Sequence, residues 1–375
     1  MKPSKPLVDF EKIVLIVVII YTLSLLFVFN ISSADTIELS PLKNQYGMLL
    51  KHLLFGFVSV IAFNIVRNLS IRIIDENIET ILAVSVFFLL LPFAPIVGVT
   101  KNGAARWFNI GGVNVQPSEI IKWIIIVFFT KQIRFIKANG WSTIELCKAF
   151  MKIFIPVLLI FLEPDNRTTL FTIIMCAYAL FVMKAPRSWF IFSCLLFMTV
   201  GITGYYVSPY VQKRIEVFLY PSDDIMGNAY QVTQAKIAIG SGGLMGRGLG
   251  SSVQKYAYLP EAQNDFILAI VGEESGFIGL FTLVFLYVTL IYLLFRKATK
   301  LSHLPYSEYA IVCSFGMAIQ VVINVGVVSG TLPPTGINLP FFSLGGSALI
   351  SNSLLLGLVL STWSNEKIPY SFESR

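Results

Sequence analysis

Long apolar runs recur along this chain from end to end, and they constrain its fold more than any other feature. A helix needs about 17 to 25 apolar residues to cross the roughly 30 Å of hydrocarbon in a bilayer. It also satisfies its own backbone hydrogen bonds, which lipid cannot do. With 55% apolar and 13% charged residues among 375, the chain has too little polar surface for a soluble globule. The sequence therefore predicts an all-α, polytopic integral membrane protein.

The hydropathy pattern predicts about ten transmembrane helices in a single membrane domain over residues 1–375. The first could be a signal peptide, since it follows a basic start, but its apolar core exceeds the usual length of about 7–15 residues. The fifth and sixth are short, so one long kinked helix is an alternative there. The predicted spans are 13–30, 48–66, 80–97, 118–133, 149–162, 168–184, 188–207, 266–295, 307–330 and 345–363.

Charge indicates how these spans are oriented. With both termini in the cytoplasm, the inner segments hold more lysine and arginine than the outer ones, including Arg67, Arg72, Lys131 and Arg134. The positive-inside rule therefore favours ten spans with both ends cytoplasmic. Topology and anionic headgroups then account for most of the net charge of +7, so no nucleic-acid partner is needed.

Residues 208–264 interrupt the alternation of apolar spans and short connections. The predicted topology makes them a large extracytoplasmic loop before the eighth helix. Long loops in compact proteins are usually functional or disordered, and the aromatics, glycines and mixed charges here favour order. Residues 230–239 predict a short interfacial helix. The segment 240–250 holds too many glycines for regular helix.

Metal and disulfide frameworks are not indicated. The cysteines lie in or near predicted helices without C-x-x-C spacing, and the two histidines are far apart in sequence. These residues are Cys147, Cys176, Cys194, Cys313, His52 and His303.

Ionisable residues at membrane depth are costly, so each is a functional candidate. Glu119 and Lys122 follow Pro117 at the start of the fourth span, and their i, i+3 spacing puts them on one face. A structural ion pair and a pair facing a polar cavity are both consistent with this spacing. Glu273 and Glu274, inside the eighth span, suggest that one carboxylate pairs with a cation from another helix and the other lines a water-filled cavity.

Asp265 stands at the outer mouth of the eighth span. An aspartate at a helix start is commonly a cap or a partner for the helix dipole, and a functional carboxylate is the alternative.

Three outer cations suggest an anion site. Arg247 lies in the glycine-rich segment and Lys255 follows it; with exposed backbone N–H groups they suit a pyrophosphate, although the order of a nucleotide P-loop is missing. Arg106 adds a third cation beside Trp107, where a simple membrane anchor is the alternative reading.

These motifs together resemble the SEDS family, the FtsW, RodA and SpoVE proteins of bacterial wall synthesis. The similarity runs in order through most of the chain, and the S-V-Q-K wording is closer to FtsW than to RodA. The segments that carry it are Arg106-Trp107, Gln116 to Lys122, Gly240 to Gly250, Ser252 to Lys255, Tyr258 to Ala262, Asp265 to Ile267, Gly272 to Glu274 and Gly336 to Ser347.

The resemblance implies a peptidoglycan glycosyltransferase of the bacterial cytoplasmic (inner) membrane. Such a protein polymerises lipid II at the outer face beside a class B penicillin-binding transpeptidase, among divisome or elongasome membrane proteins. The family's essential loop aspartate falls on Asp265, which we predict to be the general base in an inverting displacement. Predicted substrate-binding residues are Lys122, Glu119, Arg106, Arg247, Lys255 and Glu261.

The departing pyrophosphate gains negative charge, which these cations or a divalent cation such as Mg²⁺ or Mn²⁺ would offset. The sequence does not distinguish these possibilities. It leaves two other functions open: a flippase for lipid-linked precursors and a non-catalytic scaffold for a transpeptidase.

The chain departs from the family pattern at three motifs. None of them changes Asp265, so they bear on which paralogue this chain is and on how active it is, more than on the family. Gln263-Asn264 replaces the frequent His-Thr, Pro164-Asp165-Asn166-Arg167-Thr168 replaces P-D-L-G-T, and Ser343-Leu344-Gly345-Gly346 replaces S-Y-G-G.

Overall fold

The computed structural model describes residues 6–39, 46–94, 97–101, 104–207, 209–219, 228–256, 258–302 and 306–364. A helix occupies each of the ten predicted stretches. These helices are α1 (Pro6–Leu39), α2 (Gly47–Asn68), α3 (Ile71–Leu90), α4 (Pro117–Ala138), α5 (Thr143–Leu162), α6 (Asn166–Val182), α7 (Arg187–Val207), α10 (Ile267–Lys300), α11 (Ser307–Val328) and α12 (Gly346–Ser364).

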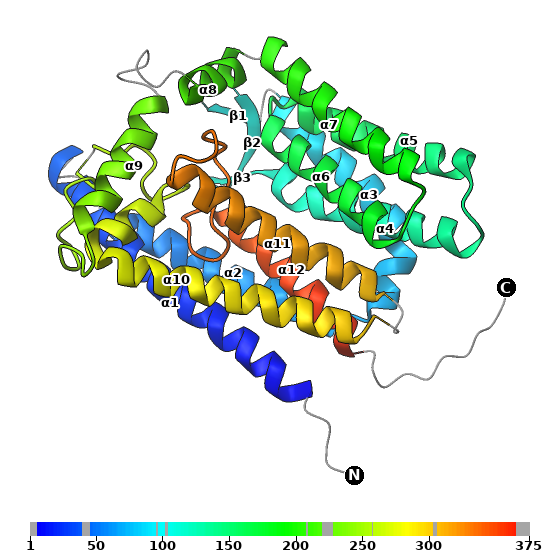
Figure 1. Cartoon of the computed structure of the whole chain (residues 1–375), viewed down its shortest axis with the longest axis horizontal. Helices are drawn as coiled ribbons and strands as arrows, with labels where there is room; N and C mark the ends of the chain where they lie inside the picture. Colours follow the sequence, from blue (N-terminus) through cyan, green and yellow to red (C-terminus); the bar gives the residue numbers. More distant parts are fainter. Residues whose placement is uncertain are drawn as a thin grey trace.

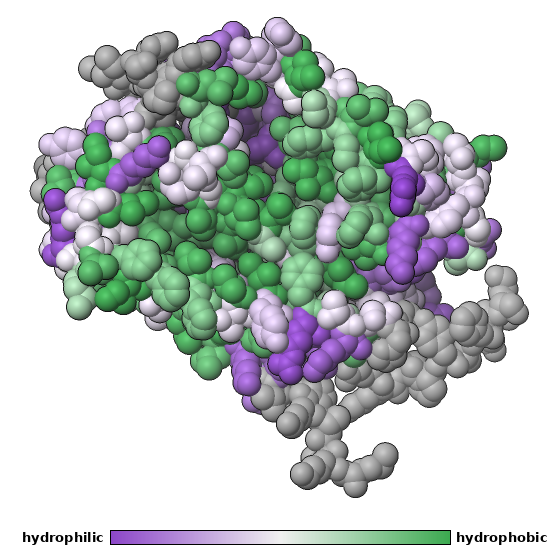
Figure 2. All heavy atoms as spheres, viewed as in Figure 1, coloured by the Kyte–Doolittle hydropathy of each residue, from purple (hydrophilic) through white to green (hydrophobic). Residues whose placement is uncertain are grey.

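Six of the helices in the described ranges are long and apolar enough to cross a membrane: α1, α2, α7, α10, α11 and α12. The molecule is therefore a multi-pass membrane protein. α3 to α6 are shorter or more polar, so the count of ten spans stays a prediction. Figure 2 shows a hydrophobic middle on one face, with hydrophilic patches toward its two ends.

The third predicted span, 80–97, has the wrong start. α3 begins nine residues earlier, at Ile71, and includes charged residues that the hydropathy pattern placed in a loop. Asp75 is the reason: its carboxylate binds Arg134 at 2.6 Å and accepts a hydrogen bond from Tyr309, so the charge is buried with partners. The helix gives way to a 3-10 turn, η1 (Leu91–Phe93), and residues 95–96 lie outside the described residues.

A small antiparallel sheet between α3 and α4 is an element that the all-α prediction missed. Its strands, β1 (Gly98–Lys101), β2 (Ala104–Ile110) and β3 (Val113–Val115), pair in the order β1-β2-β3. A bulge falls between Val99 and Thr100. The strands are short, and hydropathy windows sized for helices do not detect them.

The described part of 208–264 contains two helices, α8 (Pro209–Leu219) and α9 (Asn228–Gly242). α9 contains the predicted interfacial helix at 230–239. It also runs through Gly242, so the prediction that the glycine-rich segment is non-helical from Gly240 was wrong for its first three residues. Residues 208, 220–227 and 257 of this loop lie outside the described ranges.

α5 and α6 are separate helices, because a turn at Glu163–Asp165 divides them. The long kinked element considered as an alternative is not formed.

The helices pack around α12, which lies against α2, α4 and α11, while α10 packs on α1, α9 and α11. α8, α9 and the sheet gather at one end of the molecule, and α1 begins and α12 ends at the other (Figure 1). We call these the sheet end and the termini end. The connection between α11 and α12, residues 331–345, is irregular yet largely buried at the sheet end.

Candidate active site

A cavity of about 540 Å³ opens at the sheet end. Its walls come from β2, α4, α6, α8, the segment before α10 and the α11–α12 connection, so distant parts of the sequence converge there. Its polar lining includes Arg106, Asn114, Gln116, Glu119, Arg167, Arg214, Gln231, Glu261, Asn264, Asp265 and Asn338.

Asp265 is the most buried carboxylate on this wall that the sequence predicted, at 8% exposure, two residues before α10. Burial raises its pKa to about 6, while the positive charges of Arg214 and Arg167 act in the opposite direction. Its helix-start position was expected to keep it ionised. Burial outweighs that effect, but the carboxylate is still mainly ionised above neutral pH, as a general base must be.

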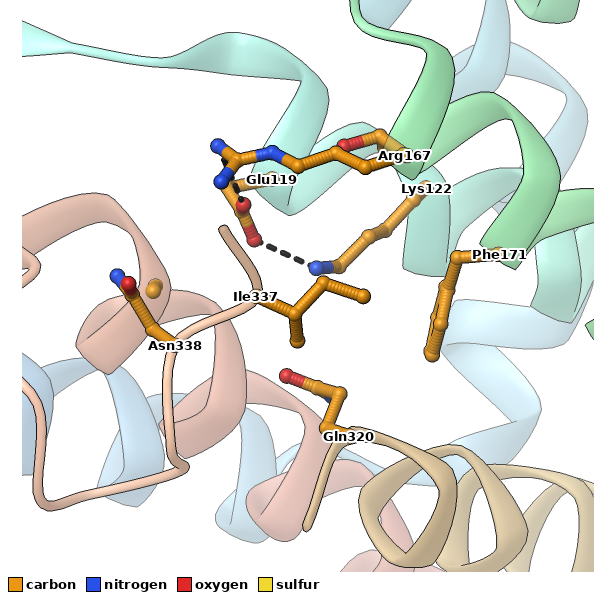
Figure 3. A pocket seen from close by; sticks show the side chains of 9 residues that line it. Glu119, Lys122, Arg167, Phe171, Gln320, Ile337 and Asn338 are labelled. Atoms are coloured by element: carbon orange, nitrogen blue, oxygen red, sulfur yellow. Dashed lines mark hydrogen bonds and ion pairs between the residues drawn. The ribbon is translucent and has the colours of Figure 1, made fainter. Parts of the chain in front are cut away.

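Glu119 and Lys122 form the ion pair that their spacing predicted, with 2.5 Å between Oε2 and Nζ. Lys122 is 6% exposed, and its ammonium lies over the rings of Trp123 and Phe171. Glu119 also lines the large cavity, so the pair is a structural ion pair that borders it. Figure 3 shows the pair in a smaller adjoining pocket, with the ammonium of Lys122 directed at Glu119.

Arg167 connects this pair to the rest of the wall. Its guanidinium lies 3.7 Å from Glu119 and 3.2 Å from Asp165, and it donates to the backbone carbonyl of Gly336. Figure 3 shows the side chain extending from α6 over Glu119. From the sequence, Arg167 was noted only as a replacement within a family motif, because no neighbouring residue indicated that it belongs to the site.

Arg106 is also held in place, since it donates to the backbone carbonyls of Glu163 and Pro164 at the α5–α6 turn. Two buried carboxyl groups lie beside it. One is Asp165. Burial favours its neutral form, but the nearby positive charges of Arg167 and Arg106 hold its pKa below the usual value. Burial and the neighbouring Asp165 raise the pKa of Glu163 to about 9, so Glu163 is a neutral acid at pH 7. Arg106 therefore does more than anchor the chain at an interface.

Arg247 and Lys255 lie in a different cluster and are not in the cavity lining. Arg247 pairs with Glu273 at 3.4 Å and Lys255 with Glu274 at 3.2 Å; both glutamates are 1% exposed. Both glutamates thus pair with cations from the loop that precedes α10. The expected partner from another helix was wrong, and neither carboxylate lines this cavity, contrary to the prediction for one of them.

Arg214 and Asn338 also line the cavity and were not among the site residues predicted from the sequence. Arg214, on α8, donates to the carbonyl of Pro334 at 2.9 Å and influences Asp265 electrostatically. Asn338 comes from the α11–α12 connection. From the sequence, Arg214 is only an arginine in an amphipathic loop helix, and that does not by itself indicate a site. Glu261 was predicted and does line the cavity, with a left-handed backbone at φ 57°.

The described ranges contain no group of three or more His, Cys, Asp or Glu side chains placed to hold a metal ion. The carboxylates of the cavity wall are instead interleaved with arginines. This donor set does not fit a dedicated metal site.

Geometry thus defines a multi-pass membrane protein with one deep polar cavity, built around a buried aspartate and several arginines. A family model described as a cell cycle protein, FtsW/RodA/SpoVE, matches residues 11–368. The chain belongs to this family, which the resemblance predicted.

Similar proteins support the assignment. The chain is 34% identical to "Stage V sporulation protein E" of Bacillus subtilis over 93% of its own length and 95% of that protein. It is 35% identical to "Probable peptidoglycan glycosyltransferase FtsW" of Coxiella burnetii, covering 92% and 94% of the two chains.

Solved structures share the fold. One, described as "Structural coordination of polymerization and crosslinking by a peptidoglycan synthase complex", aligns with a TM-score of 0.73 at 24% identity, over 95% of this chain and 98% of the other. The Thermus thermophilus rod shape determining protein RodA aligns with a TM-score of 0.67 at 23% identity, over 95% and 97% of the two chains.

Proposed function

We propose that this protein is a peptidoglycan glycosyltransferase that polymerises lipid II at the outer face of the bacterial cytoplasmic membrane, in support of cell division or elongation. The observation that carries the proposal is Asp265, a buried carboxylate that lines a cavity of about 540 Å³ at one end of a helical membrane bundle. Relatives named probable peptidoglycan glycosyltransferases, similar over most of the chain, support the same activity.

In the proposed reaction, a sugar hydroxyl of one lipid-linked chain attacks the anomeric carbon of the other. The new carbon–oxygen bond forms as the bond to the pyrophosphate oxygen breaks, so one displacement inverts the configuration. Asp265 accepts the hydroxyl proton, and the lipid pyrophosphate leaves with the bonding electrons. A sugar hydroxyl is a weak nucleophile until it loses its proton. A base that is ionised above pH about 6 can accept that proton as the hydroxyl attacks.

The departing pyrophosphate gains negative charge, which nearby cations stabilise best in a site screened from water. Arg106, Arg167 and Arg214 line the cavity and are proposed to face it. Glu119 orients Lys122 behind this wall, and Glu261 is proposed to contact the sugars. Because Arg247 and Lys255 are engaged by Glu273 and Glu274, we propose that they shape the loop and do not contact phosphate. A divalent-cation requirement is tested by adding EDTA, Mg²⁺ or Mn²⁺ to the assay.

The orientation follows from charge. Lys131, Arg134 and Lys137 belong to the end of α4 distant from the cavity, as expected for a cytoplasmic face. This placement supports cytoplasmic termini, an extracytoplasmic cavity and a loop 208–264 outside the cell. A class B penicillin-binding transpeptidase is the proposed partner, in keeping with the synthase complex that shares the fold.

A lipid flippase and a scaffold are distinguished from an enzyme by one experiment. Purified protein in liposomes receives labelled lipid II, with and without a cognate transpeptidase, and glycan ladders and translocation are measured in parallel. The proposal predicts ladders. Translocation without ladders under all partner conditions would instead favour the flippase, and neither activity would favour the scaffold.

A further inference from the structure

Asn324, on α11, is 1% exposed and contacts the segment that bears the proposed base. Its Nδ2 donates to the backbone carbonyl of Asp265 at 2.9 Å and to that of Ile337 at 2.8 Å. We propose that Asn324 is a positioning residue, which joins Asp265 to the α11–α12 connection and thereby sets the geometry of the base. This inference rests on the proposed function.

The α11–α12 connection forms one wall of the cavity through Gly336 and Asn338. It has no regular secondary structure to hold it, so its position depends on side-chain and backbone ties. Leu344 donates its backbone N–H to the carbonyl of Gln263 at 2.9 Å, two residues before Asp265. Tyr287 of α10 and Ser24 of α1 donate to the carbonyls of Pro340 and Phe342 further along the connection. Asn324 is the side chain that bonds both the connection and Asp265.

Arginines fix the same connection from the opposite side. Arg167, from α6, donates to the carbonyl of Gly336, and Arg214, from α8, donates to that of Pro334. The connection is therefore held by side chains of α11, α6 and α8 near Asp265, and by α10 and α1 further along. Loss of the α11 tie leaves the arginines in place but frees Asp265 to shift relative to them.

The chemistry of this position calls for a primary amide. One side chain donates here to two carbonyl oxygens, one buried and one partly buried, and an amide nitrogen carries the two N–H donors that this needs. A serine or threonine hydroxyl has one donor, and an ionised aspartate has none. An apolar side chain at position 324 would leave both carbonyls without this donor in a buried setting, which is unfavourable.

The test compares Asn324→Ala and Asn324→Asp with a matched control, Asn352→Ala. Asn352 is a buried amide of α12 that binds Gln320 at 3.2 Å and is not bonded to the Asp265 segment. In lipid II polymerisation, Asn324→Ala is expected to lower kcat at least tenfold while KM changes by less than twofold. Asn352→Ala is expected to keep kcat within about threefold of wild type.

The pH profile adds a readout that a purely structural role would not change. The charged groups around Asp265 are Arg106 on β2, Arg214 on α8, Arg167 on α6, Glu119 on α4 and Glu261 on its own segment. In Asn324→Ala the Asp265 segment can shift away from Arg214 and Arg167, whose positive charges favour the ionised carboxylate. The acid limb of Asn324→Ala and of Asn324→Asp should therefore move to higher pH, whereas that of Asn352→Ala should match the wild type.

Hydrogen exchange tests the tie without reference to activity. In Asn324→Ala, amides of 261–266 and 336–344 should exchange at least fivefold faster, and in Asn352→Ala they should be unchanged. Unchanged exchange and kcat in Asn324→Ala, or equal losses in both alanine variants, would overturn the inference. If the wild type makes no polymer yet the exchange pattern appears, the proposed function fails while the tie stands.

Discussion

The ionisation of Asp265 gives the proposed chemistry a pH dependence that can be measured. Burial raises its pKa to about 6, so the base is lost as the pH falls through this value. We predict that kcat for polymerisation rises with pH along a limb centred near pH 6 and then levels off. A single-turnover assay between pH 4.5 and 8.5 checks this. A limb centred near the ordinary aspartate value of about 4 would show that burial does not control the base.

The same burial has a cost in stability. The folded pKa of Asp265 lies above its ordinary value of 3.8, so the folded state favours the proton, and the ionised carboxylate destabilises the fold above pH about 6. Asp265→Asn should therefore stabilise the protein at pH 7.5, by up to about 3 kcal/mol, and have little effect near pH 4. Thermal unfolding in detergent at both pH values measures this; a destabilised variant at pH 7.5 would contradict it.

Arg167 lies in a motif that departs from the family pattern, and it lines the cavity. It links Glu119, Asp165 and Gly336, and its charge lowers the pKa of Asp265. We predict that Arg167→Gln moves the acid limb of kcat to higher pH and costs about 1–3 kcal/mol of stability, because Asp165 is fully buried. A matched change at a surface arginine, Arg72→Gln, should alter neither; an unshifted limb in Arg167→Gln would refute the electrostatic role.

At the scale of elements, the loop between α9 and α10 is bound to the first turns of α10. Glu273 accepts hydrogen bonds from Ser252 and the backbone of Val253, and Glu274 pairs with Lys255. Gly246 has no room for a side chain against the backbone of Glu274, so the two segments are in close contact. This attachment fixes the start of the segment that ends in Asp265.

The Lys255–Glu274 pair is nearly inaccessible, with side-chain exposures of 4% and 0%. Removing one partner of a buried pair leaves an uncompensated charge, which costs about 3–5 kcal/mol. Lys255→Met should therefore destabilise strongly, and Lys255→Met combined with Glu274→Gln should recover a large part of the loss. A double-mutant cycle by thermal unfolding measures this. Additive losses would mean that the two charges do not interact.

Helices were predictable at this scale because each carries its own apolar pattern. The ends and the small elements were not. α3 extends nine residues further toward its start, since Asp75 finds Arg134 and Tyr309 on other helices, and hydropathy cannot register such partners. The sheet β1-β2-β3 is too short for the same windows.

Across the whole molecule, the sequence placed Asp265, Glu119, Arg106 and Glu261 among the candidate residues, and one cavity unites them. Their convergence was predictable only through the family resemblance, because they come from three separate segments: β2, α4 and the segment before α10. Arg214 had no local signal that tied it to a site. The phosphate role that the glycine-rich loop suggested for Arg247 stays a prediction; in the structure this cation pairs with a buried carboxylate on α10.

The molecule as a whole is a helical frame that holds an irregular wall against a buried base. α10 and α11 carry the base segment and Asn324, while α4, α6 and α8 present the arginines and Glu119 across the cavity. Such a frame keeps the base and the cations in fixed positions, which is the arrangement that electrostatic catalysis requires.

The most direct test of this account is lipid II polymerisation by wild type, Asp265→Asn and the control Glu216→Gln, each purified with its cognate transpeptidase. Glu216 is an exposed α8 carboxylate that bonds Gln212, so its amide variant matches the chemical change outside the cavity. We predict glycan ladders from wild type and Glu216→Gln, and a loss of at least about 100-fold in Asp265→Asn. Ladders of equal length and rate from Asp265→Asn would contradict the assignment of the base.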